Sequence, residues 1–356
     1  MSDRSEFKKY LAVTGGAGFI GSNLLHYMVN KYPDYLFVNI DCLTYAGNMT
    51  SLAGIENKAN YRFEKINITD FEKLKGCFDK YNFDGLIHLA AESHVDRSIT
   101  GPAEFVNTNI LGTFNLLELA RNRAADNKPF RFHHVSTDEV FGSLDESGYF
   151  TETTPYRPNS PYSASKAASD HLVRAYFFTY GLDVVTTNCS NNYGPYQFPE
   201  KLIPLMIRNA RADIPLPVYG DGKNIRDWLY VEDHCQAIDL VFHKGKAGET
   251  YNIGGHNEIE NIKLVKMICR IIDDITGNNG EPKEKLITFV EDRPGHDRRY
   301  AIDASYIEKQ LGWKPKYTFE EGIRRTVQWY IDNEDWLNNC ISGRYLKYYD
   351  DMYSKR

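Results

Sequence analysis

Two short segments carry the residues best able to do chemistry, 136–139 (Ser-Thr-Asp-Glu) and 162–166 (Tyr-Ser-Ala-Ser-Lys). The first follows a run, 132–135, that is typical of a buried strand, so its polar groups should lie at the carboxyl edge of a parallel sheet, where such sheets hold ligands. In the second, Tyr162 and Lys166 are four residues apart and therefore share one face of a helix. A phenol beside an ammonium, facing a hydroxyl and two adjacent carboxyls, can move both a hydride and protons.

Lys166 is the group expected to prepare Tyr162 for proton transfer. Tyrosine has a reference pKa of about 10, so a base near neutral pH needs a pKa lower by about 3 units, or about 4 kcal/mol. A cation about 4 Å away contributes up to about that much at an effective dielectric constant of about 20, and the positive ring of an oxidised nicotinamide cofactor adds to it. We also expect Lys166 to hold the nicotinamide ribose, and the Thr137 hydroxyl to bind the same substrate oxygen as Tyr162.

Asp138 and Glu139 exceed what the oxidation of an alcohol requires, because that reaction uses only the tyrosine. Two additional carboxyls at the sheet edge predict a general acid and a general base, each worth about 10²–10⁴ in rate. An isolated Asp-Glu pair would usually be a turn cap and a solvated side chain. Its position directly after Thr137 favours catalysis.

A glycine-rich turn at 13–21 follows the first expected strand and opens a helix. Gly15, Gly18 and Gly21 allow a tight turn, close approach of the backbone to a pyrophosphate, and packing of helix on strand. Asp41 ends the next strand, about 20 residues beyond the last glycine, where a carboxylate accepts the ribose hydroxyls. It repels a 2′-phosphate, and the three residues that follow it carry no positive charge: Cys42, Leu43 and Thr44. NAD is therefore expected rather than NADP.

Strand-like and helix-like segments must alternate to position these residues. Strands are predicted at 10–14, 35–40, 86–91, 132–135 and 184–187, and helices begin near residues 18, 103 and 160. This rhythm predicts an α/β fold with a doubly wound parallel (Rossmann) sheet. From residue 195 prolines punctuate short elements, and amphipathic helices are predicted at 261–275 and 319–330, which indicates a smaller mixed α/β lobe. We expect residues 1–194 and about 225–255, including a helix at 231–242 and a strand at 250–253, to bind NAD, and an interleaved lobe of 195–224 and 256–340 to bind substrate.

Composition excludes several classes of function. The 356 residues carry a formal charge of -6, which provides no basic field for nucleic acid, and no apolar run reaches the roughly 18 residues of a membrane span. The six cysteines are scattered, which favours reduced thiols in a cytoplasmic protein. No metal site is expected, since His133 and His134 are adjacent in a strand and point to opposite faces.

The longer motifs are similar to those of the extended short-chain dehydrogenase/reductases, and within that family to the sugar-nucleotide 4,6-dehydratases. The similarity runs from residue 11 to about 329. It rests on segments 89–98 (LAAESHVDRS), 136–140 (STDEV), 188–195 (NCSNNYGP), 198–204 (FPEKLIP), 226–228 (RDW) and 293–297 (RPGHD). Related epimerases usually lack the Asp-Glu pair and related decarboxylases usually have Ser where this chain has Asp138, so Asp138 favours a dehydratase.

The resemblance implies a role for each catalytic residue. Tyr162 is expected to deprotonate the sugar 4-hydroxyl as hydride leaves C4 for NAD⁺, Glu139 to take the C5 proton, and Asp138 to protonate the departing 6-hydroxyl. Hydride then returns to C6, giving a 4-keto-6-deoxy sugar. The expected substrate is a nucleotide-diphosphate hexose, dTDP-glucose in the first place, and the expected assembly is a homodimer.

Matched positions imply the binding residues. Those expected to contact NAD are Gly15, Gly18, Phe19, Ile20, Gly21, Asp41, Cys42, Leu43, Thr44, Asn67, Ile68, Leu89, Ala90, Ala91, Ser93, Thr108, Tyr162, Lys166 and Asn192. Those expected to contact substrate are Ser93, Thr137, Asn191, Lys201, Leu202, Pro217, Val218, Tyr219, Arg226, Asn261, Asp292, Arg293, Pro294, Gly295 and His296. Arg226 and Arg293 are the expected diphosphate clamps, because a guanidinium fork suits phosphate oxygens. Asn67 replaces a common Asp near the adenine and Phe141 replaces a common Tyr, and neither change removes a catalytic group.

Other readings stay open at this point. A sugar-nucleotide 4-epimerase, a decarboxylase, or a dehydratase of another nucleotide sugar would use the same cofactor turn, and the preference for thymine over uracil follows only from the resemblance. A regulatory protein built on an inactive enzyme would tolerate loss of the catalytic side chains, yet Tyr162, Lys166, Asp138 and Glu139 are all present.

Overall fold

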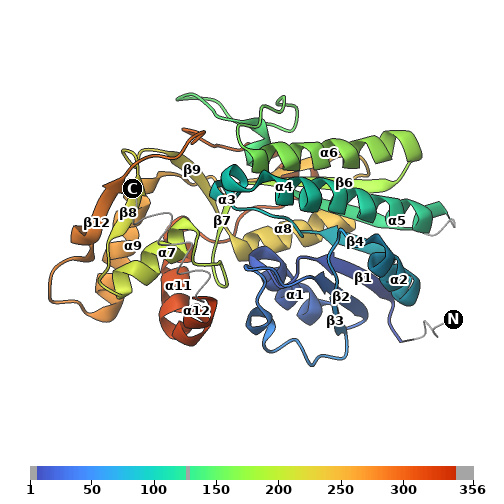
Figure 1. Ribbon diagram of the computed structural model, residues 1–356, viewed down its shortest axis with the longest axis horizontal. Coiled ribbons are helices and arrows are strands. Elements are labelled where there is room, and N and C mark those ends of the chain that lie inside the picture. The colour runs from blue at the N-terminus through green and yellow to red at the C-terminus, as the bar shows by residue number, and fades with distance from the viewer. Residues whose placement is uncertain (1–5, 126–128, 342–356) are drawn as a thin grey trace.

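A seven-stranded parallel sheet forms the centre of the larger lobe in the computed structural model, which describes residues 6–125 and 129–341 (Figure 1). Its strands are β1 (Lys9–Thr14), β2 (Tyr35–Asp41), β3 (Tyr61–Lys65), β4 (Gly85–His88), β5 (Arg131–Thr137), β6 (Asp183–Cys189) and β10 (Thr250–Ile253). Their spatial order is β10-β6-β5-β4-β1-β2-β3, so the winding reverses between β1 and β4. The predicted doubly wound sheet is therefore confirmed, and its switch point lies where such sheets bind ligands.

Helices cover both faces of this sheet because buried side chains alternate along each strand. Leu11 and Val13 pack with α1 (Phe19–Lys31) and α8 (Val231–Lys244), whereas Ala12 packs on the other face. That other face is covered by α2 (Phe71–Tyr81), α5 (Thr113–Ala125) and α6 (Pro161–Tyr180). Figure 1 shows α5 and α6 on one side of the sheet and α1 on the other.

One predicted boundary in this lobe is wrong, and one strand was not predicted. The strand expected at 86–91 is β4, which ends at His88, because Leu89 and Ala90 turn away to donate hydrogen bonds to the Thr14 carbonyl and hydroxyl. The helix expected near residue 103 is α4 (Pro102–Phe105), which passes through a π-helical segment, Val106–Gly112, into α5. The strand β3, with the sequence YRFEK, was missed because an edge strand exposed to solvent carries no continuous apolar run.

The smaller lobe contains two short sheets and a helical layer. Strand β9 (Ile225–Tyr230) lies between β7 (Asn191–Tyr193) and β11 (Glu258–Glu260), and β8 (Leu216–Tyr219) pairs with β12 (Ile287–Val290). The chain therefore returns to the central sheet only with α8 and β10, after β9. The remaining helices of this lobe are α7 (Leu202–Arg211), α9 (Asn261–Thr276), α11 (Phe319–Asp332) and α12 (Glu334–Cys340). Two further helices belong to the larger lobe: α3 (Val95–Thr100), and α10 (Ser305–Leu311), which packs on β10 and α8.

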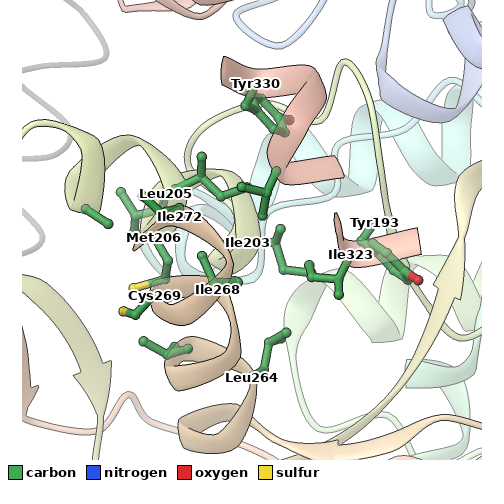
Figure 2. Packing of buried hydrophobic residues seen from close by; sticks show 14 of the residues in the cluster. Tyr193, Ile203, Leu205, Met206, Leu264, Ile268, Cys269, Ile272, Ile323 and Tyr330 are labelled. Carbon is green, nitrogen blue, oxygen red and sulfur yellow. The ribbon is translucent and has the colours of Figure 1, made fainter. Parts of the chain in front are cut away.

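A hydrophobic core of its own holds the smaller lobe together. Figure 2 shows Leu264, Ile268 and Ile272 along one face of α9, packed with Ile203 of α7 and Ile323 of α11. The four-residue spacing is that of an amphipathic helix, so both predicted amphipathic helices of this lobe are confirmed. These elements give the substrate side of the site a rigid base.

No helix in the described part of the chain has the length and apolar content needed to cross a membrane. The aromatic stretch at 345–353 lies outside the described residues.

Candidate active site

One cavity of about 350 Å³ runs along the carboxyl ends of β1, β2, β4 and β5 and reaches the segment before α7. It brings the two chemically active segments and the glycine-rich turn together. The predicted site residues that line it are Gly15, Gly18, Phe19, Ile20, Gly21, Asp41, Cys42, Thr44, Asn67, Ile68, Leu89, Ala90, Ala91, Ser93, Thr108, Thr137, Asp138, Glu139, Tyr162, Lys166, Asn191, Asn192 and Lys201.

The glycine-rich turn leaves no room for side chains. Gly15 has a φ of +72°, and a Cβ placed on it would lie 2.7 Å from the backbone of Ala90. A Cβ on Gly21 would lie 2.2 Å from the carbonyl oxygen of Gly15, so the turn packs directly on the first helix. Gly18 is the N-cap of α1 and supplies no side-chain cap, which leaves the first amides of the helix available to an anion.

Asp41 holds the turn in shape, and its carboxylate can still accept hydrogen bonds from a ligand. Its Oδ2 accepts a hydrogen bond from the Ala17 amide at 2.9 Å, and its Oδ1 accepts one from the Leu43 amide at 2.8 Å. Each carboxylate oxygen has a second acceptor position for a ribose hydroxyl. Burial raises the pKa of Asp41, and the two backbone hydrogen bonds oppose that shift. The turn and the carboxylate together fit the pyrophosphate and adenosine ribose of NAD.

The helix that carries the tyrosine begins at a well-formed cap. Ser160 and Ser163 form a reciprocal capping box, and Pro161 occupies the first helical position, where its missing N–H costs nothing. Tyr162 therefore lies in the first turn of α6 with its side chain buried at the cavity. Lys166, one turn later, donates a hydrogen bond from Nζ to the Val135 carbonyl at 2.9 Å.

The protein groups around Tyr162 raise its pKa, whereas a lower pKa is expected once NAD⁺ is bound. Burial raises the pKa of Tyr162 well above its usual value, the charge of Glu139 raises it further, and a hydrogen bond from Thr137 opposes the shift. The Lys166 ammonium donates to the Val135 carbonyl, and burial lowers the pKa of Lys166. The predicted lowering of the Tyr162 pKa relies on Lys166 together with the positive nicotinamide ring, so it stays a prediction for the protein with NAD⁺ bound.

Asp138 and Glu139 lie in different electrostatic surroundings although they are adjacent. Burial raises the pKa of Asp138 well above its usual value, and the charges of Glu139 and Asp227 add to this. Its Oδ2 has no hydrogen-bond partner among the described residues. Burial also raises the pKa of Glu139, but three cations oppose that shift: Arg293, Lys201 and Arg226. The surroundings thus favour a neutral acid at Asp138 and an ionised base at Glu139.

The two arginines expected to clamp a diphosphate reach the site from the smaller lobe. Arg226 is buried on β9, stacks at 4.3 Å on the ring of Tyr300, and donates from Nη2 to the Asp297 carbonyl at 2.9 Å. Arg293 donates from Nη1 to Oδ1 of Asp96 at 3.0 Å, and its buried Nε has no hydrogen-bond partner within the described part of the chain. Both are therefore oriented by protein groups and keep donors for a ligand.

A loop after β12 holds the remaining charged groups on the substrate side. Oδ1 of Asp292 accepts hydrogen bonds from the Arg293 amide at 2.8 Å and from Nδ1 of His296 at 2.6 Å. Burial lowers the pKa of His296 to about 4, and the charge of Arg293 acts in the same direction. A neutral histidine here can accept or donate a hydrogen bond without adding charge.

Some predicted residues lie outside the cavity wall. They are Leu43, Leu202, Pro217, Val218, Tyr219, Arg226, Asn261, Asp292, Arg293, Pro294, Gly295 and His296. Leu43 contributes its amide to Asp41, and the others lie at the start of α7, on β8 and β9, at the start of α9 and in the loop after β12.

Other lining residues were not predicted as site residues: Ile40, Ala46, Gly47, Ile66, Glu92, Glu104, Val135, Ser136, Cys189, Ser190, Gln197, Phe198 and Glu200. Several belong to quoted motifs, 89–98 and 198–204, which is the signal that could have identified them.

A buried polar network lies behind the tyrosine helix. Asp170 accepts hydrogen bonds from His134 at 3.0 Å, Ser136 at 2.9 Å and Tyr156 at 2.9 Å, and burial raises its pKa to about 6. His133 instead contacts Thr187, so the two histidines do point to opposite faces. No group of three metal-ligating side chains occurs in residues 6–125 and 129–341. Phe141 packs on Phe150, where an additional hydroxyl is not needed.

Comparison with known proteins gives consistent matches over nearly the whole chain. The family model described as GDP-mannose 4,6 dehydratase matches residues 12–326. A dTDP-glucose 4,6-dehydratase of Shigella flexneri is 56% identical, with 97% of this chain and 99% of that protein covered.

Solved structures agree with this match. A dTDP-glucose 4,6-dehydratase of Bacillus anthracis in complex with NAD has a TM-score of 0.83 and 48% identity, covering 94% of this chain and 100% of that one. A dTDP-glucose 4,6-dehydratase of Streptomyces venezuelae with NAD and TYD bound has a TM-score of 0.86 and 46% identity, covering 93% and 100%.

Proposed function

The chain belongs to the GDP-mannose 4,6 dehydratase family of extended short-chain dehydrogenase/reductases, and from that premise we propose its reaction. It is an NAD-dependent hydro-lyase that converts dTDP-glucose into the 4-keto-6-deoxy sugar. Relatives that are 46–56% identical are dTDP-glucose 4,6-dehydratases, and two were solved with NAD.

The observation that carries this proposal is the split between Asp138 and Glu139. An elimination needs one group that takes a proton and one that gives a proton, and two adjacent carboxyls serve only if their pKa values differ. Burial and like charges raise the pKa of Asp138, while three cations keep that of Glu139 lower. Neither epimerisation at C4 nor oxidation of an alcohol requires a second acid and base of this kind.

Each residue then has a separate proton to move. Tyr162 accepts the proton of the sugar 4-hydroxyl, and Thr137 holds the same oxygen. NAD, held by the glycine-rich turn and Asp41, supplies the hydride acceptor and donor. Glu139 removes the C5 proton, which the 4-ketone acidifies, and Asp138 protonates the 6-hydroxyl as it leaves as water. Hydride returns to C6 while Glu139 gives a proton back to C5, and the proton taken up by Tyr162 balances the one that Asp138 gave to the departing water, so there is no net oxidation.

The two lobes divide the binding. Residues 1–194 and about 225–255 bind NAD, and residues 195–224 and 256–340 bind the nucleotide sugar, with β9 contributing Arg226 to the substrate side. Arg226 and Arg293 clamp the diphosphate, a role supported by the burial of Arg226 and by the buried Nε of Arg293, which has no hydrogen-bond partner among the described residues. Ser93 and Lys201 lie between the two sites, since Nζ of Lys201 donates to the Ser93 carbonyl at 3.1 Å.

The test is to incubate the purified protein with dTDP-glucose, UDP-glucose, GDP-mannose and UDP-glucuronic acid and to identify each product. A 4-keto-6-deoxy sugar formed fastest from dTDP-glucose supports the proposal. Inversion at C4 would instead show an epimerase, and loss of carbon dioxide from a uronic acid would show a decarboxylase. Faster reaction with another nucleotide sugar would show that dTDP-glucose is not the preferred substrate.

A homodimer and a cytoplasmic location complete the proposal. Exposed apolar side chains on the segment that leads into α5, on α5 and on α6 support a second copy as the partner: Val106, Leu111, Phe114, Phe178 and Tyr180. Phe178 is 64% exposed, so Phe178→Glu should convert dimers to monomers in sedimentation velocity. All six cysteines are free thiols, as suits a reducing compartment.

A further inference from the structure

Two side chains from separate segments, Tyr45 and Arg97, meet at one buried carboxylate, that of Glu200. Its Oε1 accepts a hydrogen bond from the Tyr45 hydroxyl at 3.0 Å, and its Oε2 accepts one from Nε of Arg97 at 3.1 Å. The Arg97 guanidinium also lies 3.8 Å from the centre of the Tyr45 ring. Each member of this Tyr45–Arg97–Glu200 cluster therefore contacts the other two.

The cluster joins the cofactor end of the cavity to the substrate end. Tyr45 stands between Thr44 and Ala46, both of which line the cavity beyond Asp41. Glu200 directly precedes Lys201, which is the N-cap of α7, the first helix of the smaller lobe. The loop over the adenosine side and the segment that carries a substrate residue are thus tied to one carboxylate.

Arg97 adds a second connection through its own helix. It lies on α3, and the preceding residue, Asp96, holds the diphosphate clamp Arg293 through the 3.0 Å ion pair. A shift of α3 therefore moves the contact to Glu200 and the contact to Arg293 together. The phosphate side of the substrate site and the cofactor loop share this helix.

Electrostatics make the cluster behave as a unit. The Glu200 side chain is 2% exposed, and burial raises its pKa while the charges of Lys201 and Arg97 lower it. If either Tyr45 or Arg97 moves away, the buried Glu200 carboxylate keeps its charge but loses a hydrogen bond. Breaking only one of these two contacts is therefore unfavourable. The loop and the start of α7 are expected to close, or open, together.

We propose that Glu200 is a positioning residue that, with Tyr45 and Arg97, couples nucleotide-diphosphate binding to NAD binding. None of the three transfers a proton in the reaction. Binding at one end holds α7, α3 and Arg293 in place, and the cluster then holds the loop at 44–47 closed over the cofactor. By linkage the effect is reciprocal, so each ligand tightens the other by the same factor. The proposal rests on the proposed function, because dTDP serves as the probe.

The experiment measures the NAD dissociation constant of the full chain by calorimetry, with and without saturating dTDP. In the parent protein we expect dTDP to tighten NAD binding by about five-fold or more. Glu200→Gln keeps the shape of the side chain but removes its charge, and Tyr45→Phe removes only the hydroxyl. In both variants dTDP should tighten NAD binding by less than about two-fold. The matched control is Glu284→Gln, which breaks an exposed ion pair with Arg270 in the smaller lobe and should keep the parental factor.

Three results would overturn the proposal. One is a parental coupling factor near one. Another is that Glu200→Gln and Tyr45→Phe bind NAD more weakly while dTDP still tightens NAD binding by the same factor as in the parent. Glu200 would then only support the fold. Failure of dTDP to bind the parent protein would refute the proposed substrate class itself and is thus distinct from the other two. Should Glu200→Gln not fold, Tyr45→Phe alone decides, because its ring keeps its contacts with Arg97 and Phe198.

Discussion

Replacing Glu139 with glutamine should separate oxidation of the sugar from elimination of water. The variant keeps the size of the side chain and its hydrogen-bonding ability but cannot take the C5 proton. Loss of a general base lowers the rate of that step by about 10²–10⁴, which corresponds to about 2.7–5.4 kcal/mol of barrier. The oxidation step uses Tyr162 and should survive.

The surroundings of Glu139 sharpen this expectation. Its charge is the largest cause, after burial, of the raised pKa of Tyr162, so its removal lowers that pKa and lets the phenol ionise more readily. The three cations around position 139 also lose an opposing charge, so a substrate diphosphate should bind as tightly or more tightly. Hydride transfer to NAD⁺ should therefore be as fast as in the parent or faster, while product formation is greatly slowed.

The assay is a single turnover with dTDP-glucose, followed by NADH absorbance and by product analysis in deuterated water. We expect an NADH signal that forms and persists, with no deuterium at C5. Tyr162→Phe should instead suppress the NADH signal, because the first proton has no acceptor. Glu146→Gln, an exposed charge on the loop that follows β5, is the matched control and should behave as the parent. Parental product formation or normal deuterium incorporation by Glu139→Gln would show that Glu139 is not the base.

Further outcomes follow from the same geometry. With the parent enzyme NADH should not accumulate in proportion to substrate consumed; stoichiometric NADH would contradict a hydride that returns to C6. Asp41→Ala should weaken NAD binding by about ten-fold or more, since charge-assisted hydrogen bonds are lost, and should affect dTDP less; equal losses in titrations of both ligands would contradict the placement of Asp41 at the ribose. Asp138→Asn should unfold at a higher temperature than the parent above about pH 4, with the gap closing at lower pH. A carboxyl with a raised folded pKa binds its proton more tightly in the native state, so its ionisable group reduces stability as pH rises. Identical melting curves of the two proteins at pH 8 would refute this.

The local motifs were sufficient to predict where the chemistry lies. A glycine turn after a strand, an acidic residue at the end of the next strand, and the spacing of Tyr162 and Lys166 are properties of consecutive residues, and they predict backbone and helix-face geometry directly. The parallel sheet follows from the same alternation. Boundaries were less predictable, since β4 ends where the Leu89 and Ala90 amides find Thr14, a residue 75 or more positions away along the chain.

The protonation behaviour of those residues was decided only by tertiary structure. Sequence spacing places a lysine beside Tyr162, but only the fold shows that this lysine donates to the Val135 carbonyl and that burial and the charge of Glu139 raise the pKa of the phenol. Asp138 and Glu139 are neighbours with nearly equal reference pKa values. They differ in this protein because Arg226 and Arg293 arrive from the smaller lobe near Glu139 and Asp227 near Asp138. Burial and through-space charge depend on which distant segments meet, and that information lies in packing rather than in the order of nearby residues.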